Sequence, residues 1–134
     1  RIYGARGFQQ YQVVIPKNNA ESGIKEMLKI ISKSSSGSFL ATLKSFGDIR
    51  SPGLLSFPEN GTTLALDFPN TGTLKTELFS KLDVIVREAH GKLYPAKDAS
   101  MDGVDFRLAY PNWIKLEKMR DPALLSQFWQ RVTR

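Results

Sequence analysis

The sequence contains no cysteine and a single histidine, His90. Without cysteine the chain has no disulfide bonds and no thiolate metal sites, and its redox compartment stays undetermined. With one imidazole, a zinc or iron centre built on histidine ligands is not expected. No apolar run approaches the roughly 18 residues that a membrane-spanning helix needs, and no signal-peptide pattern is visible.

Several common catalytic patterns are also missing. The chain has no glycine-rich loop of the kind that holds phosphate groups and no nucleophile elbow. Its carboxylates are spaced like those on solvated helix faces. His90 follows a helix pattern, where it is expected to interact with the helix dipole. The sequence therefore gives no sign of a nucleotide-phosphate site or of a hydrolase nucleophile.

What is present is a folded, basic chain of one domain's length. Its 134 residues are 41% hydrophobic, and 19 Lys and Arg against 13 Asp and Glu give a net charge of +6. This charge suits an anionic ligand. The basic residues are scattered, with no run of five or more, so we expect no nucleic-acid partner.

The hydrophobic pattern predicts two similar halves separated by a loop rich in glycine and proline. Strand-like segments lie at 7–16, 39–44, 61–68 and 92–94, with the loop at 45–60. A helix pattern lies between the strands of each half, so the order is β-α-β, loop, β-α-β. This order predicts an α+β fold with a split βαβ (ferredoxin-like) sheet that carries helices on one face.

Capping and stripe patterns place the helices. The first helix is expected to begin at Asn18, with a core stripe formed by Ile24, Met27, Leu28 and Ile31. The second follows Thr73 and ends before Gly91, which is expected to adopt a left-handed conformation. The C-terminal tail is predicted to be helical at 100–110, 113–119 and from 121 onward, with Ser100, Asn112 and Asp121 as caps.

Two amide side chains on the first predicted strand form a candidate wall. Gln10 and Gln12 are two residues apart, so they share a strand face. The pair fits either the solvated face of an edge strand or the wall of a ligand site. If Leu43 faces the core, Lys44 points away from it, towards solvent or a cleft.

The segment 91–98 places Tyr94, Lys97 and Asp98 where the last strand should end. A lysine held at a strand end can stabilise developing negative charge or act as a base when desolvated. The alternative is an ordinary surface lysine beside Asp98.

Five short motifs occur in one order along the chain: FQQYQ at 8–12, LKSFG at 43–47, LSFP at 55–58, LDFP at 66–69 and GKLYPAKD at 91–98. With AYP at 109–111 and RDP at 120–122, this series resembles the C-terminal half of the decaprenylphosphoryl-ribose oxidase group of FAD-linked oxidoreductases. That group is similar in fold to vanillyl-alcohol oxidase, in which an N-terminal domain binds FAD and an α+β domain covers the flavin.

The resemblance implies that the whole chain, 1–134, is a substrate-binding or cap domain. It also implies that the chain is a C-terminal fragment that lacks the FAD-binding domain. Lys97 and Tyr94 would lie at the flavin and the substrate hydroxyl, and Gln10, Gln12 and Lys44 would line the sugar pocket. The implied reaction oxidises a secondary alcohol of a sugar or polyol, free or lipid-linked, with hydride transfer to FAD. The implied partner is an FAD-binding N-terminal half of the same protein.

Two positions depart from the resemblance, since Thr63 and Ala65 stand where the mycobacterial enzymes carry Asn and Cys. This change alters the pocket wall and admits a different sugar or polyol. We expect a cytoplasmic location, with or without association with a membrane. The alternative function is a non-catalytic basic α+β module that binds an anionic ligand or a protein partner.

Overall fold

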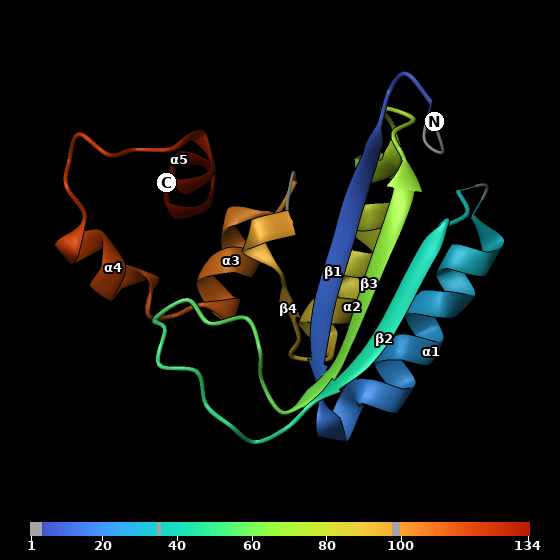
Figure 1. The fold of residues 1–134 in the computed structure, drawn as a ribbon, viewed down its shortest axis with the longest axis horizontal. Helices are drawn as coiled ribbons and strands as arrows, with labels where there is room; N and C mark the ends of the chain where they lie inside the picture. Colours follow the sequence, from blue (N-terminus) through green and yellow to red (C-terminus); the bar gives the residue numbers. More distant parts are fainter. Residues whose placement is uncertain (1–3, 35, 98–99) are drawn as a thin grey trace.

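In the computed structural model, which describes residues 4–34, 36–97 and 100–134, four strands form one antiparallel sheet (Figure 1). The order across the sheet is β2-β3-β1-β4. The strands are β1 (Phe8–Pro16), β2 (Leu40–Phe46), β3 (Gly61–Pro69) and β4 (Lys92–Leu93). With one helix after β1 and another before β4, this is the split βαβ arrangement, and the predicted α+β fold class is confirmed.

Two helices cover one face of the sheet, and the other face is free of helices in Figure 1. They are α1 (Lys17–Lys33) and α2 (Ser80–Glu88), and a π-helical turn, η1 (Lys75–Phe79), leads into α2. Alternate strand residues such as Val13, Ile15 and Leu64 point at the helices and are almost fully buried. This packing supplies most of the core.

The tail folds into four short helices beside the β4 edge of the sheet (Figure 1). They are η2 (Pro95–Lys97), α3 (Gly103–Ala109), α4 (Trp113–Met119) and α5 (Gln127–Thr133). Arg87 of α2 pairs with Asp105 of α3 at 2.6 Å, and the Tyr110 hydroxyl donates to the carbonyl of Leu93 at 2.6 Å. Phe106 is fully buried in the same core cluster as the sheet residues, so the tail belongs to one core.

Several predicted helix ends are wrong by a few residues. Helix α1 begins at Lys17, with Pro16 at the cap position and no side-chain cap bond, so Asn18 lies inside its first turn. Asp102, not Ser100, caps α3 by accepting from the Val104 amide. Ser126, not Asp121, caps α5. In each case the predicted cap is a polar residue near the helix end, and sequence pattern alone does not tell which residue at that end makes the cap bond.

The remaining predicted caps also differ in detail. Asn112 does precede α4 but makes no side-chain cap bond. The left-handed residue after α2 is His90, with φ 56°, and not Gly91. Gly91 is required for a different reason, because a Cβ there would lie 2.6 Å from the carbonyl oxygen of Val14. The glycine therefore allows the chain to approach β1 closely.

One predicted core residue, Leu28, is instead 45% exposed on α1. Leu43 lies opposite Leu64 on the helix-covered face, so Lys44 points to the other face, but Leu43 is itself 60% exposed. Strand β2 is an edge of the sheet, so only one neighbouring strand shields its side chains. Among the described residues, no helix combines the length and apolar character needed to cross a membrane.

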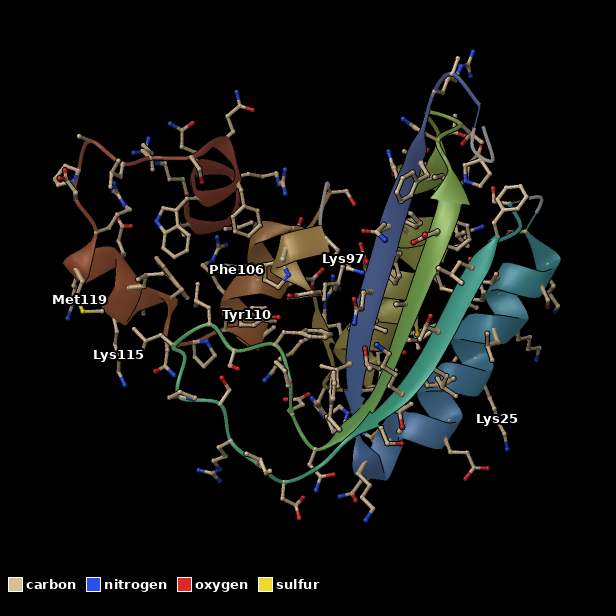
Figure 2. All side chains as sticks on the ribbon, viewed as in Figure 1. Lys25, Lys97, Phe106, Tyr110, Lys115 and Met119 are labelled. Atoms are coloured by element: carbon tan, nitrogen blue, oxygen red, sulfur yellow. The ribbon has the colours of Figure 1, made fainter. Side chains whose placement is uncertain are left out.

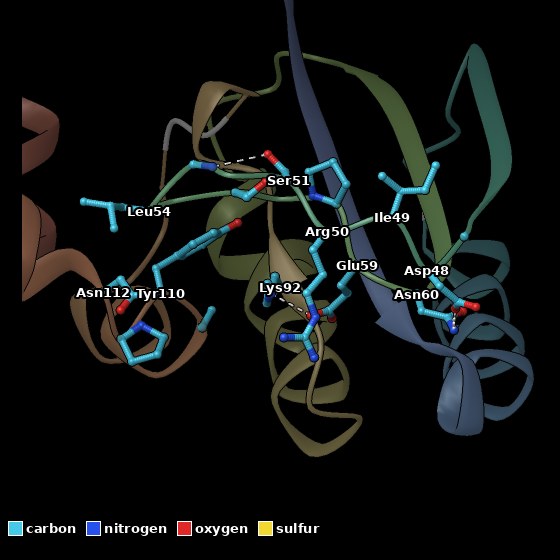
Figure 3. A pocket seen from close by; sticks show the side chains of 16 residues that line it. Asp48, Ile49, Arg50, Ser51, Leu54, Glu59, Asn60, Lys92, Tyr110 and Asn112 are labelled. Atoms are coloured by element: carbon cyan, nitrogen blue, oxygen red, sulfur yellow. Dashed lines mark hydrogen bonds and ion pairs between the residues drawn. The ribbon is translucent and has the colours of Figure 1, made fainter.

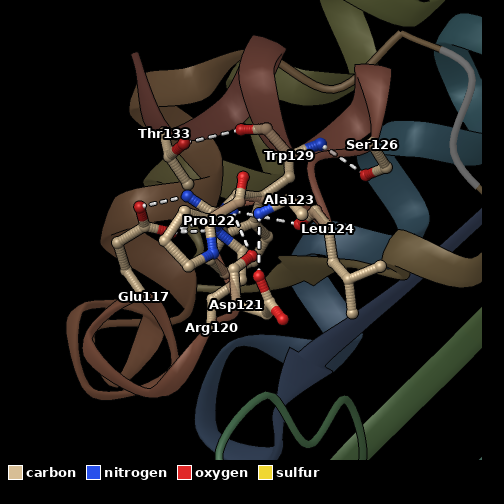
Figure 4. A network of polar contacts seen from close by, with 9 residues as sticks. All are labelled: Glu117, Arg120, Asp121, Pro122, Ala123, Leu124, Ser126, Trp129 and Thr133. Atoms are coloured by element: carbon tan, nitrogen blue, oxygen red, sulfur yellow. Dashed lines mark hydrogen bonds and ion pairs between the residues drawn. The ribbon is translucent and has the colours of Figure 1, made fainter.

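Glu117 joins α4 to α5 in a polar network (Figure 4). It accepts from Arg120 Nε at 2.8 Å and from Trp129 Nε1 at 2.5 Å, and Arg120 also donates to the carbonyls of Asp121 and Leu124. The hydrogen bonds from Arg120, and then that from Trp129, lower the pKa of Glu117 from 4.5 to about 2. The carboxylate therefore stabilises the tail in its charged form.

This lowered pKa predicts a pH-dependent stability. Because the folded-state pKa is below the unfolded value, the contribution of Glu117 is present above pH 4.5 and is lost as the pH falls towards 2. The thermal unfolding midpoint of Glu117→Gln should therefore lie below that of the parent at neutral pH, and the difference should shrink on acidification. Glu88→Gln on α2 is the matched control. A difference that stays constant from neutral pH to pH 2 would contradict the prediction.

Candidate active site on the open face of the sheet

Gln10 and Gln12 lie on the open face of β1, which pairs with β3 along its whole length but with β4 only at Val13 and Val14. At Gln10 the strand therefore has a paired neighbour on one side only, and this pairing agrees with both interpretations of the two glutamines. Gln10 Nε2 donates to Asp67 Oδ1 at 2.9 Å, and Gln12 Nε2 donates to Thr63 Oγ1 at 3.1 Å. Strand β3 thus fixes both amides and leaves their carbonyl oxygens as acceptors on the face.

Tyr94 and Lys97 reach the same face from the end of β4. The Tyr94 amide donates to the carbonyl of Gln12 at 2.9 Å, which extends the β1–β4 pairing by one bond. The Lys97 amide then donates to the Tyr94 carbonyl at 3.1 Å and closes the η2 turn. Figure 2 places Lys97 between α3 and β1. The structure thereby brings Tyr94 and Lys97 next to the two glutamines.

These four residues line one hollow, together with Tyr11, Phe79, Leu93 and Ser100. Its volume is only about 10 Å³, roughly the space of one water molecule. A ligand larger than water would therefore rest against this surface and not inside it. Such a surface needs a second wall to enclose a substrate.

Lys44 lies on the same face but outside the hollow. It is opposite Thr63, the residue that accepts from Gln12, and β3 separates it from β1. Two strand spacings place its backbone roughly 10 Å from β1. Lys44 can therefore contact a ligand that extends across the sheet.

The polar ends of three of these side chains are unused within the part of the chain that the structure describes. There the ammonium groups of Lys44 and Lys97 make no ion pair or hydrogen bond, and the Tyr94 hydroxyl makes no hydrogen bond. Asp98, the proposed neighbour of Lys97, lies outside the described residues. Two cations and a hydroxyl are thus available to bind a ligand.

The loop at 47–60 contributes residues that motif reasoning did not assign to the site. Phe57 is buried and stacks on Tyr94, with ring centroids 4.5 Å apart and an angle of 22°. Glu59 pairs with Lys92 of β4 at 2.6 Å. The LSFP motif at 55–58 drew attention to this stretch. The signal that could have indicated a packing contact is an aromatic residue, Phe57, that lies between Pro52 and Pro58 inside a loop.

A larger cavity, about 580 Å³, lies under the same loop and against Lys92, Tyr110 and Asn112 (Figure 3). Burial, and then the negative charge of Glu59, raise the pKa of the Tyr110 hydroxyl above its ordinary range, so it stays a donor to Leu93. Tyr94 and Lys97 do not line this cavity. Size and chemistry therefore point to different places. The chemistry places the candidate site at the hollow, where the Lys97 ammonium, unpaired among the described residues, lies near two oriented amides.

Comparison with known proteins tests the resemblance suggested by the motifs. The chain is 38% identical to decaprenylphosphoryl-beta-D-ribose oxidase of Mycolicibacterium smegmatis over 128 aligned positions that cover 91% of this chain. The resemblance to the decaprenylphosphoryl-ribose oxidases is confirmed. The chain spans about a quarter of that oxidase, 26% of its length. No family model matches the chain.

Proposed function

We propose that this chain is the substrate-binding cap of an FAD-dependent oxidoreductase that oxidises a secondary alcohol of a sugar or polyol. The observation that carries this proposal is the convergence of Gln10, Gln12, Tyr94 and Lys97 on one hollow beside β1 and the end of β4. The name of the relative, an oxidase of decaprenylphosphoryl-beta-D-ribose, supports a ribose derivative as the substrate class.

The two glutamines are suited to hold sugar hydroxyl groups. Each amide donates one N–H bond, to Asp67 or to Thr63, which orients the amide so that its carbonyl oxygen can accept from a hydroxyl. Fixed acceptors reject analogues that lack the hydroxyl, because the acceptor is then left unpaired. Lys44, across the sheet, is placed for a more distant anionic part of the substrate.

The donor set at the end of β4 fits a cofactor that gains negative charge. Lys97 offers an unpaired ammonium and Tyr94 an unpaired hydroxyl within the described residues. We infer that these two residues contact FAD, which supplies the hydride acceptor when bound. The Lys97 ammonium stabilises negative charge that develops during the reaction, and the Tyr94 hydroxyl positions the substrate hydroxyl. The FAD-binding N-terminal half of the same protein is the proposed second wall of the hollow.

The proposal predicts a visible property of the complete protein that contains this chain. Purified from its full gene, it should show the absorbance spectrum of oxidised flavin, and the bands should bleach without oxygen when a short-chain prenylphosphoryl-β-D-ribose is added. The matching prenyl phosphate without the sugar is the control and should leave the spectrum unchanged. A colourless protein would contradict the oxidoreductase proposal and favour the non-catalytic binding module.

A further inference from the structure

The ring of Tyr94 is held by packing and not by a hydrogen bond. Within the described residues its hydroxyl has no partner, while its ring stacks on Phe57 at 4.5 Å. Offset stacking of this kind contributes about 0.5–1.5 kcal/mol beyond the area that it buries. A tyrosine that must present a free hydroxyl to a ligand needs such support, because nothing else fixes its side-chain angle.

Phe57 itself is firmly placed. It is 4% exposed, and Phe46 at the end of β2 meets it edge to face at a centroid distance of 6.1 Å. Val14, on the open face of β1, is fully buried, although no helix covers that face. The loop therefore packs against this end of the sheet, and Phe57 belongs to the resulting small apolar cluster.

The same loop is fixed to β4 a second time. Glu59 pairs with Lys92 at 2.6 Å, and the side chains are only 24% and 21% exposed. The Asn60 carbonyl accepts from the Lys17 amide at 3.1 Å, and the Asn60 side chain donates to Asp48 across the neck of the loop. Loop residues 57 and 59 thus contact strand-end residues 94 and 92, two positions apart in both segments.

This double attachment compensates for a short strand. Strand β4 pairs with β1 at only Val13 and Val14, so the ladder alone gives the segment that carries Tyr94 and Lys97 little support. The stacking of Phe57 on Tyr94 and the largely buried ion pair between Glu59 and Lys92 add support from the loop. Rigid support of this kind is what holds reactive groups in productive geometry.

We propose that Phe57 is a positioning residue that fixes the ring of Tyr94 for substrate binding, with the Glu59–Lys92 pair holding the loop in register. This inference rests on the proposed function, since Tyr94 is assigned there to the substrate hydroxyl. Phe57 contacts neither substrate nor cofactor and acts through Tyr94. The loop at 47–60 is thereby part of the site's support.

The test begins with a measurement that needs no substrate. The complete protein is labelled with 3-fluorotyrosine, and the fluorine resonance of Tyr94 is assigned with Tyr94→Phe. Phe57→Leu keeps an apolar side chain but removes the ring current, so it should shift the Tyr94 resonance, while Phe57→Tyr should keep it close to its original position. A Tyr94 resonance that is unchanged in Phe57→Leu would overturn the inference.

The second measurement is the rate of flavin reduction by a short-chain prenylphosphoryl-β-D-ribose, measured without oxygen. Phe57→Leu should lower the maximal rate by about 10- to 100-fold, the cost of a small misplacement of a reacting group, with a smaller change in the half-saturating concentration. Phe57→Tyr should recover most of that rate. In a protein that already carries Tyr94→Leu, adding Phe57→Leu should lower the rate little further, because both changes remove the same function, that of a correctly placed Tyr94 hydroxyl.

The outcomes separate the two proposals. If the losses from Phe57→Leu and Tyr94→Leu multiply in the double variant, Phe57 acts independently of Tyr94 and the inference is overturned while the proposed function stands. If Tyr94→Leu leaves the rate unchanged, the site assigned under the proposed function fails, and the positioning role fails with it. If Phe57→Leu does not fold, Phe57→Tyr and Glu59→Gln are compared instead, because Glu59→Gln releases only the ion pair with Lys92. If Glu59→Gln changes neither the Tyr94 resonance nor the rate, the role of the ion pair in holding the loop is overturned.

Discussion

Lys97→Ala is expected to slow flavin reduction in the complete enzyme by about 100-fold, the loss typical of removing one preorganised charge-stabilising donor from an active site. Lys97 lies in the hollow with Gln10 and Tyr94, and its ammonium is unpaired among the described residues. The effect should appear in the maximal rate of the reduction step, because the charge that the ammonium stabilises develops during the reaction.

The same change should leave folding almost untouched. Since the Lys97 side chain makes no hydrogen bond or ion pair in the described part of the chain, its removal should change the free energy of unfolding by at most about 0.5 kcal/mol. Lys29→Ala, at an exposed lysine of α1 on the opposite face, is the matched control for charge. Flavin reduction that survives Lys97→Ala at the parent rate would remove Lys97 from the site.

Phe106→Ala is expected to lower the free energy of unfolding by about 3–5 kcal/mol, the usual cost of deleting a large aromatic side chain from a core. Phe106 is fully buried on α3, and its ring contacts those of Tyr110, Phe128 and Trp129. Removing it leaves a cavity at the point where the tail helices join the sheet.

Chemical denaturation measures this change directly. Leu108→Ala is the matched control, because Leu108 belongs to the same helix but is 66% exposed, so its loss should cost far less. A single cooperative transition in the parent, with a lowered midpoint in Phe106→Ala, would show that tail and sheet unfold together. Equal midpoints in the two variants would contradict the packing of α3 into the common core.

The strand and helix order follows from the sequence because its periodic signals are strong and local. Strands β1 and β3 are rich in β-branched, aromatic and aliphatic residues and end at Pro16 and Pro69. The stripe of the second helical segment is buried as expected at Leu78 of η1 and at Leu82 and Ile85 of α2. Helix ends are less certain because several polar residues near each end can serve as caps, and packing decides among them. Asp102 was therefore missed beside Ser100.

The site was predictable only as far as motifs and strand alternation reach. Alternation places Gln10 and Gln12 on one face, and the motif series adds Tyr94, Lys97 and Lys44 as predictions. Where along β1 the β4 pairing ends depends on contacts between distant segments, so the sequence could not show that Gln10 lies beyond it. The stacking of Phe57 on Tyr94 depends on how the loop at 47–60 returns to the sheet, which no local pattern specifies.

The pairing of β1 with β3 also constrains the order in which the chain can fold. These two strands form the longest ladder of the sheet, yet they come from distant parts of the chain. At one end of the ladder, Gln9 donates through its side chain to Asn70, 61 positions away. During synthesis, β1 must wait without its main partner until that distant segment has left the ribosome, and a large loop must close before the central ladder forms. Helix α1 and the later contacts between α3 and α5 are local and can form quickly. The central strand pair is therefore expected to form after these local contacts, and the hollow that it supports cannot be completed before it forms.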